Sequence, residues 1–183
     1  MSNPEKQRLL KRFNLDWEIV MRAIEGGLVS SLAFLIGAHL VRSVNGSNAI
    51  IGAVWSAIAG LVVLQTAHRE ILKFAGLQAI GTFLGALLSA LYLLAFPASI
   101  FGLAVCACAT TLACYAIHIA DQARLASAAA VVIMGVSILS KRHSPLLNAE
   151  LRFVESLIGL SLAVLVSYSL NGTKRLLLRP RRQ

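Results

Sequence analysis

The sequence is poor in charged residues, which make up only 14% of its 183 positions. A soluble domain of this size carries nearer to about a quarter of charged residues. The charges that are present gather at the two ends and in short links, with long apolar stretches between them. This distribution is typical of a chain whose solvent is lipid. It argues against an ordinary soluble domain.

Acidic residues are scarce, since 8 Asp and Glu stand against 17 Lys and Arg and leave a net charge of +9. A basic excess is one mark of nucleic-acid binding, but such proteins display it on a folded soluble surface. The long apolar stretches leave no soluble domain to carry that surface. The excess is therefore interpreted as a topology signal and as an attraction for lipid headgroups, and no nucleic-acid partner is expected.

Cysteine is also rare, and Cys106, Cys108 and Cys114 all fall in one apolar stretch. An odd number of thiols in lipid argues against disulfides. Residues two apart on a helix point about 200° away from each other, so Cys106 and Cys108 cannot share a metal ion. The three thiols are interpreted as small packing residues, and no metal or cofactor is expected.

Motifs of catalysis are missing as well. The sequence contains no HExxH, no GxSxG, no P-loop and no CxxC. Without a soluble domain, an enzyme would need an active site inside the membrane, and no spacing of Ser, His and Asp suggests one. We expect that the protein is not an enzyme.

The N-terminal segment 1–22 does not have the pattern of a secretory signal peptide. Its first part is polar and of mixed charge, and the apolar stretch that follows is long enough to span a membrane. Leu9, Phe13, Trp17 and Val20 lie three to four residues apart with Lys and Arg between them. This spacing predicts an amphipathic helix on the inner membrane surface. An ordinary basic flank that sets topology is an equal alternative.

Six apolar segments meet or approach the roughly 20 residues that a membrane-spanning helix needs. We expect these helices at residues 23–44, 49–67, 74–96, 99–120, 123–140 and 153–171. The links are short, so consecutive helices should be antiparallel neighbours, and the longest link is 141–152. The sequence thus predicts an all-α membrane protein with a six-helix transmembrane domain over residues 23–171.

The distribution of Lys and Arg predicts the orientation. With the N-terminus inside, 13 of these residues fall on the inner side and four on the outer side. Inner loops carry the excess of positive charge in membrane proteins, so both termini are expected in the cytoplasm. Without the two ends the count is three against four, so the ends decide the predicted orientation.

The C-terminal segment 172–183 forms a basic tail. Its five basic residues are Lys174, Arg175, Arg179, Arg181 and Arg182. Such a cluster next to the last span attracts anionic lipid headgroups. The alternative is that the tail only sets topology.

Small residues mark two helices as candidates for close packing. Gly52, Ser56 and Gly60 follow one another at intervals of four, and Gly81 and Gly85 form a GxxxG pair. In lipid, helices associate through such small faces because their backbones can approach closely. We expect the helices at 49–67 and 74–96 to cross tightly at these residues.

Polar groups within the predicted spans are the candidates for function, because ionisable residues are rare and costly in lipid. Arg152 and Glu155 lie three residues apart near the outer start of the last helix. As an interfacial pair they would only anchor a helix end. The functional interpretation is that Arg152 attracts an anion through its planar fork of donors, and that Glu155 carries a coupling proton. Gln65 and Gln78 would form the cytoplasmic mouth of a pathway.

Three segments, in this order, are similar to the fusaric acid resistance (FUSC) and aromatic acid exporter family. They are VWSAIAGLVVLQ at 54–65, Lys73 followed by GTFLG at 81–85, and RFVESLIG at 152–159. The last segment resembles the family pattern RxxETxIG, with Ser156 where Thr is usual. Gln78 also departs from the pattern, since the family has Arg three residues before the GT pair.

This resemblance implies a six-helix module that moves organic anions, often aromatic carboxylates, outward across the inner (plasma) membrane. Related plant malate channels pair two six-helix units around an anion path, so a single small module is expected to oligomerise, most simply as a homodimer. Arg152 and Lys73 would attract the anion, Glu155 would couple its movement to protons, and Gln65 and Gln78 would line the inner path. The alternative is a non-transporting membrane protein that binds a partner or lipid through its basic ends.

Overall fold

The computed structural model describes residues 17–44, 49–66, 70–139 and 144–177. These residues form helices and contain no strand. The helices are α2 (Trp17–Val44), α3 (Ala49–Leu64), α4 (Ile71–Ala95), α5 (Ile100–Ala116), α6 (Ala123–Leu139) and α7 (Pro145–Leu177). The predicted all-α class is confirmed for the described part of the chain.

Four helical stretches are long and apolar enough to cross a membrane. They are Ile19–Leu40, Ile71–Ala95, Ala120–Leu139 and Leu146–Leu170. The helices α3 and α5 are equally apolar but have only 16 and 17 residues. At about 1.5 Å of rise per residue they measure roughly 25 Å, slightly less than the hydrocarbon core of about 30 Å. The six predicted spans therefore appear as four full-length helices and two shorter ones.

Four of the predicted helix boundaries are wrong by four or more residues, since α2 begins at Trp17 rather than at residue 23 and α7 ends at Leu177 rather than at residue 171. The last helix begins at Pro145 rather than at residue 153, so much of the predicted link 141–152 is helical. Proline suits the first position of a helix because the N–H that it lacks would have no partner there. The helix α5 ends at Ala116 rather than at residue 120. His118 stops it by adopting a left-handed backbone with φ of 63°, and the 3-10 turn η1 (Ala120–Gln122) then leads into α6.

The two basic ends lie partly outside the described residues. The helix α2 begins at Trp17 and continues without a break through the predicted boundary at residue 22. Leu9 and Phe13, which carry half of the predicted amphipathic pattern, lie outside the described part of the chain. So do Arg179, Arg181 and Arg182, whereas Lys174 and Arg175 belong to the last turns of α7.

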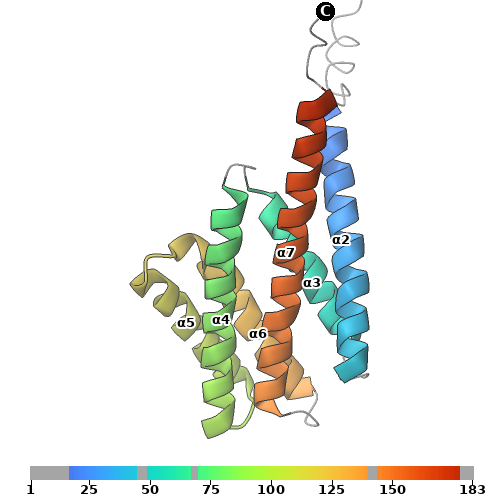
Figure 1. The fold of residues 1–183 in the computed structure, drawn as a ribbon. Coiled ribbons are helices and arrows are strands. Elements are labelled where there is room, and N and C mark those ends of the chain that lie inside the picture. Colours follow the sequence, from blue (N-terminus) through green and yellow to red (C-terminus); the bar gives the residue numbers. More distant parts are fainter. Residues whose placement is uncertain (1–16, 45–48, 67–69, 140–143, 178–183) are drawn as a thin grey trace, which may run out of the picture.

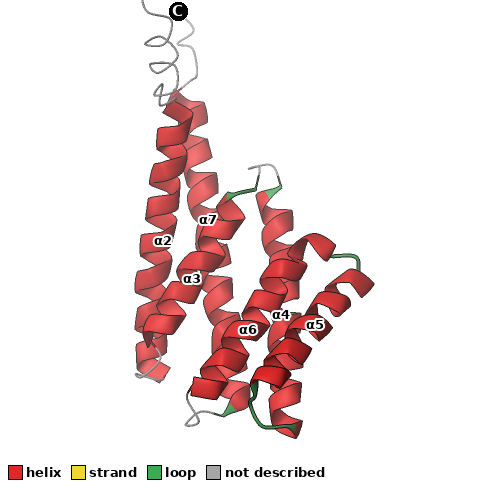
Figure 2. Cartoon of the chain, turned by 180° about the vertical axis from the view of Figure 1, so that it is seen from behind, coloured by secondary structure: helices red, strands yellow, loops and turns green. Residues whose placement is uncertain are grey.

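The helices form two groups of three, joined along α4 and α7 (Figure 1). One group consists of α2, α3 and α7, which pack against one another, and the other consists of α4, α5 and α6. Figure 2 shows the same two groups from behind. The neighbours in sequence α3 and α4 touch only slightly, because α3 packs mainly on α2 and α7. The expectation that every consecutive pair would pack side by side is therefore wrong for α3 and α4.

The predicted tight crossing of α3 and α4 is also wrong, although their small residues do lie at close helix contacts. A Cβ atom at Gly60 would come within 3.0 Å of the carbonyl oxygen of Gly159 on α7. One at Gly85 would overlap the carbonyl oxygen of Ala126 on α6. Small side chains permit close approach to any partner, so each of these two faces meets a helix other than the predicted one.

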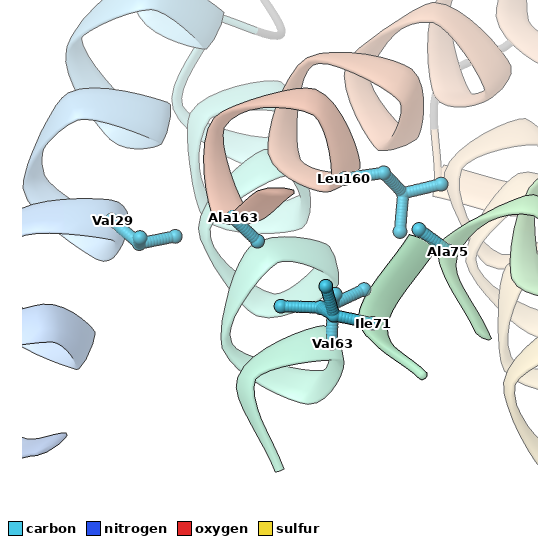
Figure 3. Packing of buried hydrophobic residues seen from close by; sticks show 6 residues of the cluster. All are labelled: Val29, Val63, Ile71, Ala75, Leu160 and Ala163. Carbon is cyan, nitrogen blue, oxygen red and sulfur yellow. The ribbon is translucent and has the colours of Figure 1, made fainter. Parts of the chain in front are cut away.

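Buried apolar side chains hold the first group of helices together and join it to α4. Val29, Val63, Ile71, Ala75, Leu160 and Ala163 form one cluster (Figure 3). They come from α2, α3, α4 and α7. In the second group, Cys106 packs with Ala130 and Met134, and Cys114 packs with small residues of α6. Cys108 is exposed.

Candidate functional site

Polar side chains are buried inside this apolar bundle. Those on α3, α4 and α7 that are at most 5% exposed are Ser56, Gln78, Thr82, Ser89, Asn148, Arg152, Glu155, Ser156 and Ser167. Polar groups in the interior of a membrane protein are costly and mark functional pathways. The site is therefore sought where these groups converge.

Arg152 and Glu155 form a charged pair on α7 that is almost fully enclosed by protein. Nη1 of Arg152 lies 2.8 Å from Oε2 of Glu155, and the two side chains are 1% and 0% exposed. Residues three apart on a helix lie on the same face, which brings the two groups together. The positive charge of Arg152 and the negative charge of Glu155 compensate each other, which makes the burial of both ions tolerable.

The pair leaves much of its hydrogen-bonding capacity unused. The contact between Arg152 and Glu155 is short, but its orientation does not make a directed hydrogen bond. Nε of Arg152 and Oε1 of Glu155 have no hydrogen-bond partner among the described residues. A guanidinium carries five donors in a planar fork that fits a carboxylate. The site therefore has free donors for an anion and a free acceptor for a proton.

A hydrogen-bond chain connects this pair to α3. The indole N–H of Trp55 donates to the hydroxyl of Ser156 over 2.7 Å. The hydroxyl of Ser156 in turn donates to the carbonyl oxygen of Arg152 over 2.9 Å. Serine reaches the carbonyl four residues earlier in a helix without distorting its own backbone greatly. These two hydrogen bonds hold α3 beside the turn of α7 that carries Arg152 and Glu155.

A small cavity of about 10 Å³ lies where α3, α4, α6 and α7 meet. Its polar lining residues are Trp55, Gln78, Thr82 and Ser156, and its apolar lining includes Leu125. Oε1 of Gln78 is buried without a hydrogen-bond partner among the described residues. A volume of this size holds about one water molecule. The cavity is therefore polar but closed to any organic anion in this conformation.

The structure separates the five predicted pathway residues into two places. Gln78, Arg152 and Glu155 are buried in the interior, whereas Gln65 and Lys73 are exposed at the junction of α3 and α4. Lys73 lies near the start of α4, and α4 runs antiparallel to α7. The two residues predicted to attract the anion, Lys73 and Arg152, therefore lie at separate places, and their roles in transport stay predictions.

Ring and core contacts fix the relative direction of α4 and α7. The start of α4 packs on the middle of α7, where Ile71 shares a cluster with Leu160. Further along α4, Phe83 meets Phe153 near the start of α7, with ring centroids 5.5 Å apart. Because the order is reversed, Lys73 and Arg152 lie toward opposite ends of the helix pair.

Sequence reasoning did not single out Trp55, Thr82 or Ser156 as site residues. All three lie in the segments 54–65, 81–85 and 152–159 that carry the family resemblance. Each of the three segments thus contains one polar side chain that lines the cavity, and these side chains were the available indication of the site. Gln122 is a further buried polar residue, and its Oε1 has no partner in the described ranges. Nothing in its sequence context distinguishes it from a loop residue.

A larger cleft of about 430 Å³ opens between α5 and α6 and holds Asp121 and Arg124. Both of these side chains are exposed, so the cleft lacks the enclosed charge that distinguishes the pair on α7. Among the described residues, no group of His, Cys, Asp and Glu is arranged to hold a metal ion.

Comparison with known protein families identifies the family of the chain. A family model described as fusaric acid resistance protein-like matches residues 27–166. The chain belongs to this family. The matched range includes every residue of the cavity and the charged pair, and it makes this fusaric acid resistance protein-like chain a multi-pass membrane protein of the transporter type. No curated protein and no solved structure matches the chain.

Proposed function

We propose that the protein exports organic anions, including aromatic carboxylates, across the cell's inner membrane as an exporter or channel. The observation that carries this proposal is the enclosed pair of Arg152 and Glu155 beside a polar cavity. A purely structural helix anchor would sit at the membrane surface, where water compensates the charges. A charge pair enclosed by protein is costly and is explained by a ligand that uses it.

The free groups of the pair suggest how an anion and a proton would bind together. A substrate carboxylate that reaches Arg152 takes the donors that now face Glu155. The carboxylate of Glu155 then loses its counter-charge and binds a proton, which keeps the net charge of the site constant. When the anion leaves, Glu155 releases the proton and pairs with Arg152 again. Because the anion and the proton bind and leave together, the proposed cycle is electroneutral cotransport, and the outward concentration gradient of the organic acid drives it.

The ends of the chain are proposed to lie in the cytoplasm, in keeping with the excess of Lys and Arg there. In this orientation the exposed Lys73 and Gln65 face the cytoplasm. There they would raise the local concentration of anions by electrostatic attraction rather than by direct binding. The protein is proposed to act as an oligomer, with a two-fold dimer as the simplest form.

A flux assay on the full chain tests the proposal. Purified protein in liposomes loaded with radiolabelled benzoate or succinate should release the anion, and Arg152→Ala should abolish this release. Arg124→Ala is the matched control, because Arg124 is an exposed arginine outside the cavity. Release that is unchanged in Arg152→Ala would remove Arg152 from the mechanism. An absence of release in the unmodified protein would favour the non-transporting alternative.

A further inference from the structure

The pattern of buried positions in the first three helices repeats in the last three, with one constant offset in residue number for each pair of helices. The first such pair is α2 and α5. The buried positions of α2 recur every four residues at Glu25, Val29, Ala33 and Gly37. Those of α5 are Gly102, Cys106, Thr110 and Cys114. Each position of the second set lies 77 residues after its counterpart in the first.

The same repetition links α3 with α6. The buried residues of α3 are Gly52, Ala53, Ser56, Ala59, Gly60 and Val63. Adding 70 to each number gives Gln122, Ala123, Ala126, Ala129, Ala130 and Ile133, all of which are buried. The side chains differ in kind, but the buried face is the same.

The helices α4 and α7 repeat with an offset of 74 residues. From Ala75 to Ser89, the buried residues of α4 are Ala75, Gln78, Gly81, Thr82, Gly85, Ala86 and Ser89. Their counterparts on α7 are Ala149, Arg152, Glu155, Ser156, Gly159, Leu160 and Ala163, and each of them is buried. The motif QxxGTxxG at 78–85 thus corresponds to RxxESxxG at 152–159.

The contacts between helices are also repeated when α2, α3 and α4 are interchanged with α5, α6 and α7. The pairs α2–α3, α3–α7 and α2–α7 of one group correspond to α5–α6, α6–α4 and α5–α4 of the other, and all six pack. The closest backbone contacts correspond as well. A Cβ at Gly85 would overlap the carbonyl oxygen of Ala126, and one at Gly159 would overlap that of Ser56. The pair α4–α7 corresponds to itself, so the axis that relates the two halves passes between these helices.

Three helices per half give the halves opposite directions in the membrane. If the first half enters from one face, the second half enters from the other, which makes an inverted repeat. Transporters built in this way bind their substrate near the middle of the membrane between the repeats, and they expose it alternately by rocking one repeat against the other.

We propose that the chain consists of two inverted three-helix repeats, 17–95 and 100–177, and that the anion is occluded in the cavity on the axis between them. Gln78 is then the binding counterpart of Arg152. This inference rests on the proposed function and names the place where the transported anion is held.

The cavity lining supports an occlusion site on the axis, because it contains both members of two corresponding pairs. Thr82 corresponds to Ser156 with the offset of 74, and Trp55 corresponds to Leu125 with the offset of 70. Because these side chains come from equivalent positions of both repeats, the cavity reaches the axis that relates them. Its other lining residues, Ile58, Ala59, Val62 and Gln78, extend it toward α3 and α4.

Gln78 and Arg152 flank this axis at equivalent depths. Each lies seven residues after the start of its helix, at Ile71 and Pro145 respectively. At about 1.5 Å per residue, this places each roughly 10 Å inside its own face of the bundle. Gln78 lines the cavity, and Arg152 lies four residues before the lining residue Ser156, on the same face of α7. In the proposed site the guanidinium of Arg152 supplies charge from one side of the axis when the helices separate, and the amide of Gln78 supplies a donor from the other side.

A binding assay separates this inference from transport itself. The chain contains two tryptophans, and Trp55 lines the cavity. In the full-length Trp17→Phe background, 4-nitrobenzoate that enters the site should quench the fluorescence of Trp55 in a saturable manner. Because the cavity is too small in this conformation, the quenching also reports that the helices have separated.

Exchanging the two corresponding residues is the decisive comparison. Arg152→Gln should weaken the binding of 4-nitrobenzoate by about tenfold or more, as expected for the loss of a charged hydrogen bond. The double variant Q78R/R152Q, which moves the charge to the corresponding position, should recover most of that affinity. The matched control Q122R/R152Q places arginine at another buried glutamine and should not recover it. Equal affinities of the two double variants would overturn the inference.

A second set of variants avoids any change in buried charge. Thr82→Val and Ser156→Ala should weaken 4-nitrobenzoate binding by similar factors, because their hydroxyls occupy corresponding places in the cavity. Thr110→Val is the control, since this buried hydroxyl donates to the carbonyl oxygen of Cys106 within its own helix. An effect of only one of the two cavity variants, or an equal effect of the control, would contradict the inference.

Flux in the same proteins distinguishes the two proposals. Binding that follows the exchange of residues 78 and 152 without transport of benzoate or succinate would refute the proposed function and support the site. Transport that requires Arg152 but is not recovered by arginine at position 78 would support the function and overturn the site on the axis.

Discussion

Gly85 lies where α4 meets α6, and Gly159 lies where α7 meets α3. These two corresponding contacts are the helix seams, and their glycines give the sharpest test of the packing. We expect Gly85→Ala and Gly159→Ala to destabilise the protein by similar amounts. In both cases the added Cβ would collide with a backbone carbonyl oxygen of the facing helix, at Ala126 and at Ser56 respectively. A backbone atom cannot turn aside as a flexible side chain can, so the helices themselves would have to move apart.

The size of the effect follows from two opposing terms. Overfilling a packed contact costs about 1–3 kcal/mol, and replacing glycine by alanine within a helix contributes about 1 kcal/mol of stability. The second term can be measured alone at Gly76 and Gly135, where an added Cβ meets nothing within 4 Å. The seam variants should therefore be less stable than these control variants by about 1–3 kcal/mol.

Thermal unfolding of the purified protein in detergent measures this difference. In a chain of about 150–250 residues, each 1 kcal/mol shifts Tm by about 2–4 °C. Gly85→Ala and Gly159→Ala should lose their monodisperse size-exclusion peak at temperatures several degrees below those of Gly76→Ala and Gly135→Ala. The reasoning is refuted if all four variants unfold together. A large effect at only one of the two seams would show that the halves are not equivalent.

Three further outcomes test other parts of the structure. Glu155→Gln should still release benzoate from liposomes, but an imposed pH gradient should no longer change the rate, because this side chain has lost the group that binds the proton. Asn148→Leu should lower the free energy of unfolding by about 1–3 kcal/mol, and the decrease in Tm measures this loss. The reason is that the amide of Asn148 donates to the carbonyl oxygen of Ile133 and to the hydroxyl of Ser137, each over 3.0 Å. Deletion of residues 174–183 should reduce binding to vesicles of anionic lipid and leave benzoate release per protein molecule unchanged, whereas loss of release would show that the tail has a role in transport.

The sequence predicted the helices well where length and apolar character alone decide the structure. The helices α3 and α6 begin at the predicted residues 49 and 123, because a change from polar to apolar residues marks both points. The start of α7 was missed for the opposite reason. Pro145 and the charged residues up to Arg152 have the composition of a loop, but the pair with Glu155 and the enclosure by neighbouring helices compensate the charge of Arg152.

Helix partners were harder to predict than helix positions. The GxxxG pair at Gly81 and Gly85 shows that one face of α4 allows close approach of another helix, but it does not identify which helix that is. The structure places that face against α6. The repeat was hidden for a related reason, since it is preserved in the spacing of buried positions rather than in residue identity, as Trp55 and Leu125 show.

The candidate site was predicted in part. The cost of charge in lipid identified Arg152 and Glu155, and the same reasoning placed Gln78 in a pathway. The predicted order of the helices also placed Lys73 and Arg152 toward opposite membrane faces. It could not show how deeply each residue lies in the bundle, because depth depends on the direction and offset of the facing helix. The hydroxyls of Thr82 and Ser156 gave no signal of their own, since such groups are also satisfied by their own helix backbone.

The two repeats share a packing pattern, but the pair of Arg152 and Glu155 corresponds to the uncharged Gln78 and Gly81, and the small residues explain how both arrangements fit. Glu155 corresponds to Gly81, and the position on α3 that corresponds to Gln122 is Gly52. A Cβ at Gly81 would already lie 3.3 Å from the Cβ of Ala126 and 3.4 Å from that of Gln122, so α4 has no room for a carboxylate there. On the other side of the axis, the corresponding small residue is Gly52 and the corresponding large one is Glu155. The bulky polar residue thus belongs to η1, directly before α6, in one case and to α7 in the other. Because α4 has no room for a carboxylate at Gly81, the pair of Arg152 and Glu155 has no counterpart at residues 78 and 81, and the proposed cycle moves one proton with each carboxylate.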